Sequence, residues 1–118
     1  MGKLSTHVLD TSTGIPAEGI RITLHRLDPE GVRHLLVTAV TNSDGRTDQP
    51  LLAAADLIPG QYELTFHVGE YFGAKRAPAD AVPFLDDVPV RFAIGDAGAN
   101  YHVPLLVTPW SYSTYRGS

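Results

Sequence analysis

Two histidines and one arginine could carry out chemistry in this sequence. His7 stands in an alternating N-terminal segment, His102 in a similar segment near the other end, and Arg46 directly after an Asp-Gly turn. Histidine exchanges a proton near neutral pH, and arginine offers a permanent planar charge to oxygen atoms. Each residue alone also has a plainer explanation as a surface or core residue. The other three histidines fall on polar strand faces, where no chemistry is expected: His25, His34 and His67.

The C-terminal segment, residues 112–118, carries two tyrosines close to the last residue. Chain ends usually fray, so aromatic side chains in this place predict that the segment packs against something. The terminal carboxylate is ionised at neutral pH and would then be a positioned negative charge.

Several kinds of site have no support in the sequence. The chain has no cysteine, so disulfides, thiol nucleophiles and thiolate metal sites are excluded. Its five histidines lack short metal-ligand spacing, and neither a nucleophile elbow nor a glycine-rich phosphate loop is present. We therefore expect no metal and no cofactor.

The charge and the apolar segments also limit the partners. Nine Lys+Arg against 13 Asp+Glu give a formal net charge of -4, which argues against nucleic-acid binding. No apolar run is long enough to span a membrane. The N-terminus lacks the apolar region of a secretory signal, so a cytoplasmic protein is expected.

Short alternating segments bounded by Gly, Pro, Asn and Asp predict an all-β protein. The 118 residues, 43% of them hydrophobic, suit a single domain over residues 1–118. One or two helical turns are expected near residues 69–76, limited by Pro78. The pattern is typical of an antiparallel sandwich, with strands expected at 4–9, 20–25, 33–41, 61–68, 88–94, 101–108 and 111–116.

Four blocks carry a resemblance to a known family: THVLD at 6–10, TNSDGR at 41–46, YHVPLL at 101–106 and YRGS at 115–118. They resemble the signature blocks of 5-hydroxyisourate hydrolase, the transthyretin-related enzyme of purine (urate) catabolism. The blocks occur in the expected order, so the resemblance covers essentially the whole chain. The last block is the most specific, because transthyretins that carry hormones lack it.

The resemblance implies a transthyretin-like β-sandwich of two four-stranded sheets with one short helix. It also implies a homotetramer, a dimer of dimers, with active sites at the dimer-dimer interface. The implied reaction is hydrolysis of 5-hydroxyisourate, a cyclic amide, to 2-oxo-4-hydroxy-4-carboxy-5-ureidoimidazoline, with no metal and no cofactor.

The same resemblance implies roles for individual residues. Of His7 and His102, one would be the general base and the other would orient it or hold the substrate, while Arg46 would stabilise the oxyanion. Ser118 would act through its hydroxyl or the terminal carboxylate. The expected catalytic residues are thus His7, Arg46, His102 and Ser118, and the expected substrate-binding residues are His7, Arg46, Tyr115, Arg116 and Gly117.

Two other classes of protein remain open. A transthyretin-like carrier of a small molecule would need apolar walls, whereas the two histidines and Arg46 would leave charge poorly compensated around an apolar ligand. An immunoglobulin-like interaction module would expose an apolar patch on a monomer.

Overall fold

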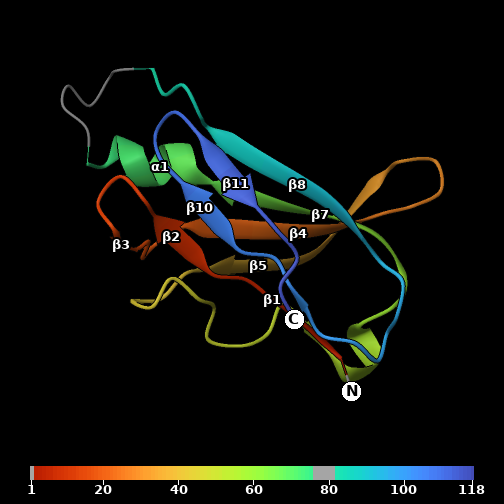
Figure 1. The fold of residues 1–118 in the computed structure, drawn as a ribbon. Helices are drawn as coiled ribbons and strands as arrows, with labels where there is room; N and C mark the ends of the chain where they lie inside the picture. The colour runs from red at the N-terminus through yellow and green to blue at the C-terminus, as the bar shows by residue number, and fades with distance from the viewer. Residues whose placement is uncertain (1, 76–81) are drawn as a thin grey trace.

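The computed structural model describes residues 2–75 and 82–118, which fold into two packed layers of strands (Figure 1). The first layer is a four-stranded antiparallel sheet in the order β5-β4-β7-β8. Its strands are β4 (Arg21–Leu27), β5 (Arg33–Val40), β7 (Gly60–His67) and β8 (Asp87–Ile94). All four were expected: β4, β7 and β8 from the alternation of apolar and polar residues, and β5 from its β-branched residues.

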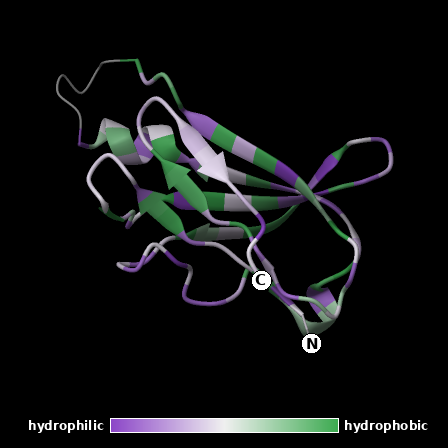
Figure 2. Ribbon diagram, viewed as in Figure 1, coloured by the Kyte–Doolittle hydropathy of each residue, from purple (hydrophilic) through white to green (hydrophobic). Residues whose placement is uncertain are grey.

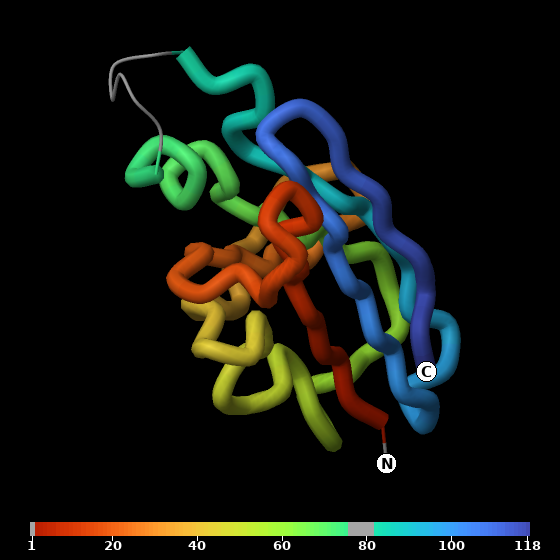
Figure 3. Tube along the Cα trace, turned by 60° about the vertical axis from the view of Figure 1, so that its left-hand side comes forward, coloured from red at the N-terminus to blue at the C-terminus, as the bar shows by residue number. Residues whose placement is uncertain are grey.

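The second layer consists of two adjoining sheets, β11-β10-β2-β3 and β6-β1-β9. The strands of this layer are β1 (Lys3–Ser5), β2 (Val8–Asp10), β3 (Ile15–Pro16), β6 (Leu52–Ala53), β9 (Tyr101–His102), β10 (Leu105–Val107) and β11 (Tyr112–Thr114). Figures 1 and 3 show the N-terminal segment running alongside the C-terminal one, where β1 pairs in parallel with β9 and β2 with β10.

The second layer differs from the expectation in two respects: β3 and β6 lie in segments where no strand was expected, and each of its two long strands is interrupted. Thr6 and His7 separate β1 from β2, and Val103 and Pro104 separate β9 from β10. Pro104 has no N–H to donate to a regular ladder. The N–H groups of Val103 and Leu105, on either side of it, donate to the carbonyl oxygens of Ser5 and His7, each at 2.9 Å, and keep the segments aligned.

The core lies between the layers. Tyr62, Leu64 and Phe66 of β7 face inward and are buried, together with Val8 and Leu105 from the second layer. Figure 2 shows the resulting bands of hydrophobic and hydrophilic residues along the strands. Each such side chain contributes about 1.5–3 kcal/mol when it leaves water, so the core fixes which face of each strand points outward.

One α-helix, α1 (Val68–Gly73), follows β7 directly. Its six residues form the one or two turns that were expected here, and Pro78, which was expected to limit the helix, lies outside the described residues. Tyr71 of α1 is buried and donates a hydrogen bond from its hydroxyl to Asp10 Oδ2 at 2.9 Å, which ties the helix to the second layer. A single 3-10 turn, η1 (Ala54–Asp56), precedes β7. Among the described residues, no helix is both long and apolar enough to cross a bilayer.

A buried carboxylate joins three strands on the outer face of the first layer. Glu63 of β7 accepts hydrogen bonds from Arg33 of β5 and Arg91 of β8, each at 2.8 Å. Burial raises the pKa of Glu63, but the hydrogen bonds from the two arginines outweigh it and hold the pKa below its usual value.

Candidate active site

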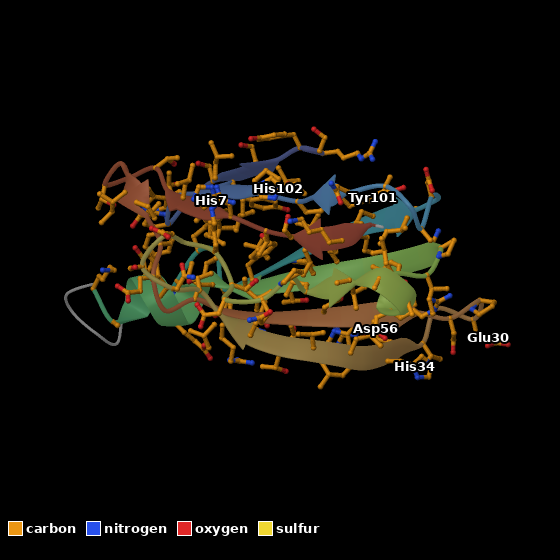
Figure 4. The ribbon with its side chains drawn as sticks, turned by 90° about the horizontal axis from the view of Figure 1, so that it is seen from below. His7, Glu30, His34, Asp56, Tyr101 and His102 are labelled. Atoms are coloured by element: carbon orange, nitrogen blue, oxygen red, sulfur yellow. The ribbon has the colours of Figure 1, made fainter. Side chains whose placement is uncertain are left out.

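His7 and His102 lie on the outward face of the second layer. Leu4, Thr6 and Val8 point inward and are buried, so His7 points outward and is half-buried. His102 is likewise half-buried between two buried neighbours. The pairing of Ser5 with His102 and of Val8 with Leu105 brings the two histidines close together, as Figure 4 shows.

Arg46 reaches this face through a tight turn. The side-chain oxygen of Asn42 accepts hydrogen bonds from the N–H groups of Asp44 (2.9 Å) and Arg46 (3.2 Å). Gly45 has φ +77, and a Cβ there would overlap the carbonyl oxygen of Val8 and lie 3.3 Å from His7 Cδ2. Glycine therefore allows the turn to press against the strand beside His7, and Arg46 follows with an exposed side chain.

The C-terminal segment contacts His102 through its backbone, whereas Tyr112 and Tyr115, from which its packing was predicted, are exposed in the single chain. Gly117 forms a two-way backbone bridge with His102: its N–H donates at 2.7 Å and its carbonyl accepts at 3.3 Å. A Cβ at Gly117 would lie 3.0 Å from His102 Cδ2, so the imidazole ring lies directly against the glycine. Ser118 follows this bridge and is exposed.

The surroundings of His102 favour a neutral ring. The pKa of His102 is below its usual value. Partial burial lowers it most, followed by the positive charge of Arg46 and then by the nearby His7. The hydroxyl of Ser5 lies 2.9 Å from His102 Nδ1. Sequence reasoning missed this contact, because Ser5 and His102 are 97 residues apart and only the strand register brings them together.

Tyr115 and Arg116 lie elsewhere in the single chain. Both line a cavity of about 270 Å³ between β11 and β8, together with Phe92. The Arg116 guanidinium lies 4.4 Å from the centre of the Tyr101 ring and donates to the carbonyl oxygen of Asn100 at 3.3 Å. Tyr101 faces the interior, so Arg116 lies at the open edge between the layers. Their expected binding of substrate stays a prediction.

The structure thus gathers His7, Arg46 and His102 on one face, with Gly117 against the His102 ring and Ser118 directly after it. That combination offers a neutral imidazole that can accept a proton and a guanidinium that can hold an oxyanion. Within residues 2–75 and 82–118, no cluster of three or more His, Asp or Glu side chains is arranged to hold a metal ion.

The fold and this face define a transthyretin-like β-sandwich protein with a site suited to proton transfer. The chain belongs to the HIUase/Transthyretin family, whose profile matches residues 4–117.

Named relatives agree with this assignment. A 5-hydroxyisourate hydrolase of Deinococcus radiodurans is 57% identical over 115 residues, which are 98% of this chain and 95% of that protein. The crystal structure of an (S)-allantoin synthase has 52% identity and a TM-score of 0.91; the match covers 99% of this chain but only 44% of that longer one. The structure of Klebsiella pneumoniae 5-hydroxyisourate hydrolase has 41% identity and a TM-score of 0.79, and the match covers all of both chains.

Proposed function

We propose that this chain hydrolyses 5-hydroxyisourate to 2-oxo-4-hydroxy-4-carboxy-5-ureidoimidazoline. The observation that carries the proposal is the close grouping of His7, Arg46 and His102 on one face, where the arginine is near enough to lower the pKa of His102. Relatives named 5-hydroxyisourate hydrolase, similar over nearly their whole length, support the same substrate.

The reaction needs a water molecule activated at neutral pH. One neutral imidazole of the His7–His102 pair takes a proton from water while the water oxygen adds to the ring carbonyl of the cyclic amide. The carbonyl oxygen becomes an oxyanion, which the Arg46 guanidinium stabilises. The oxyanion then re-forms the carbonyl, the ring C–N bond breaks, and the leaving nitrogen receives the proton from the imidazolium.

The electrostatics of His102 give this mechanism a pH dependence. Because burial, Arg46 and His7 lower the pKa of His102, its ring takes up a proton at a lower pH than an ordinary histidine does. Protonation removes the lone pair that a base needs. The rate is therefore expected to fall only as the pH drops through the lowered pKa.

We further propose a homotetramer, a dimer of dimers, with the active sites at the dimer-dimer interface. In the single chain Arg46 and Ser118 are exposed, so water would surround a substrate on this face. A facing subunit would exclude that water and strengthen the electrostatic interactions. β8 and β11 are edge strands of their sheets, and pairing across a two-fold axis is a common way to cover such edges.

The test is the decay of freshly prepared 5-hydroxyisourate, followed by absorbance with and without the protein. We expect clear acceleration, with a loss of about 10²–10⁴ in kcat/KM for His102→Asn. His34→Asn is the matched control, because His34 is an exposed histidine on β5 in the other layer, and it should retain activity. No acceleration by the wild-type protein would overturn the proposal and favour a small-molecule carrier.

Light scattering tests the assembly separately. We expect the mass of a tetramer at the concentrations used for the assay. A stable monomer with full activity would contradict an active site that needs a second subunit.

A further inference from the structure

Ser5 contacts the ring of His102 directly. Ser5 Oγ lies 2.9 Å from His102 Nδ1, within hydrogen-bond distance. Among the described residues, this is the one side chain that forms a hydrogen bond with the His102 ring. Nδ1 is therefore engaged by the protein, whereas Nε2 has no hydrogen-bond partner within residues 2–75 and 82–118.

The backbone on both sides holds this contact in place. Ser5 and His102 are register partners in the parallel pair of β1 and β9. The next residue, Thr6, is buried and donates from Oγ1 to the carbonyl oxygen of Val103 at 2.7 Å. The carbonyl oxygen of Ser5 in turn accepts the N–H of Val103 at 2.9 Å. The backbone that carries the Ser5 hydroxyl is thus fixed relative to His102.

We propose that Ser5 is the positioning residue of His102: its hydroxyl oxygen accepts the Nδ1–H of the ring and thereby leaves the Nε2 lone pair free to take a proton. This inference rests on the proposed hydrolysis, because it concerns the nitrogen that faces the reacting water. A serine hydroxyl can donate as well as accept, so this assignment requires the Ser5 O–H to point away from the ring; the Nδ1–H then donates to Ser5 Oγ and the lone pair stands on Nε2.

Two constraints then act on the same ring. The Ser5 hydroxyl fixes Nδ1 and limits rotation of the imidazole about its side-chain bonds. Gly117 supports the ring from another side, since its missing Cβ leaves room for Cδ2. Without Ser5, the neutral ring can move its proton to Nε2, and in that form it has no lone pair on that nitrogen.

Ser5→Ala removes the hydroxyl and keeps the backbone bonds. We expect kcat to fall by about tenfold to a hundredfold while KM stays within about twofold, since losing a supporting hydrogen bond typically costs this much. Ser5→Thr keeps a hydroxyl at a strand position that accepts β-branched residues, so it should restore most of kcat. Ser43→Ala, which removes an exposed hydroxyl from the turn before Arg46, is the matched control and should behave as the wild type.

A second measurement reports on the ring without substrate. Nitrogen-15 NMR of the histidine rings, with the His102 signals assigned by their loss in His102→Gln, shows which nitrogen carries the proton. We expect the Nδ1–H tautomer in the wild type and in Ser5→Thr, and a shift toward the Nε2–H tautomer in Ser5→Ala.

The outcomes separate the two proposals. If the wild-type protein fails to hydrolyse 5-hydroxyisourate, the proposed function fails, and the NMR experiment still tests the contact between Ser5 and His102. If the enzyme is active but Ser5→Ala keeps the wild-type kcat and tautomer, the role of Ser5 is refuted. An equal loss of kcat in Ser5→Ala and Ser5→Thr would also refute it, because the hydroxyl would then be irrelevant.

Discussion

Gly117→Ala should slow hydrolysis without unfolding the protein. A Cβ at Gly117 would lie 3.0 Å from His102 Cδ2 and 3.1 Å from His102 Cβ. Carbon atoms in favourable contact are about 3.5–4.0 Å apart, so the ring has to retreat by about 0.5 Å. A misplacement of about 1 Å can cost roughly a hundredfold in rate. Half that distance corresponds to about a tenfold fall in kcat/KM.

The assay is steady-state hydrolysis of freshly prepared 5-hydroxyisourate, accompanied by thermal unfolding and light scattering. The melting temperature should change little, because the segment around Gly117 is near the surface and the substitution removes no buried group. Gly95→Ala is the matched control, since a Cβ there would meet no atom within 4 Å. An unchanged kcat/KM for Gly117→Ala would show that the position of the His102 ring does not limit the reaction.

Three further predictions concern charge and the C-terminus. Arg46→Met removes a positive charge that lowers the pKa of His102, so the acid limb of the pH–rate profile should move to higher pH; an unmoved limb would show that the charge of Arg46 does not act on His102. Glu63→Gln should cost about 1–2 kcal/mol in the free energy of unfolding, measured by urea titration at pH 7. Because the pKa of Glu63 is lowered in the folded protein, the ionised carboxylate stabilises the fold at neutral pH, and the difference from Glu63→Gln should shrink as the pH falls and the carboxylate takes up a proton. An equal difference at all pH values would argue against the ion pairs. A chain ending at Thr114 should keep its melting temperature and assembly but lose at least about a hundredfold in kcat/KM, and full activity would show that residues 115–118 take no part in the chemistry.

The sequence predicted the faces of the strands well. Alternation alone placed Tyr62, Leu64 and Phe66 in the core and turned His102 away from Tyr101 and Val103, because one side of each strand had to leave water. Strands β4, β7 and β8 were predicted for the same reason, β5 from its β-branched residues, and the short helix from the break in alternation that follows β7.

The sequence did not predict how distant segments meet. The parallel pairing of β1 with β9 depends on register, and nothing local to Ser5 indicates that its partner is His102. The interruption at Pro104 was also missed, although the missing N–H of proline was a usable signal. Arg116 was expected to bind substrate. In the single chain its guanidinium lies over the Tyr101 ring, so its role toward substrate stays a prediction about the assembled subunits.

The parallel pairing between the two ends has a consequence for the order of folding during synthesis. Ser5 and His102 are 97 residues apart, so β1 has no partner on its β9 side until residues 101 and 102 have left the ribosome. Contacts between such distant residues form slowly, because a long loop must close first. The first layer, whose β4 and β5 are joined by a short turn, has its local partners much earlier. We therefore expect the nascent chain to hold an open sheet with an exposed apolar face, and the proton-transfer site to form only in the final folding step. A translation product that ends before His102 would lack the site altogether.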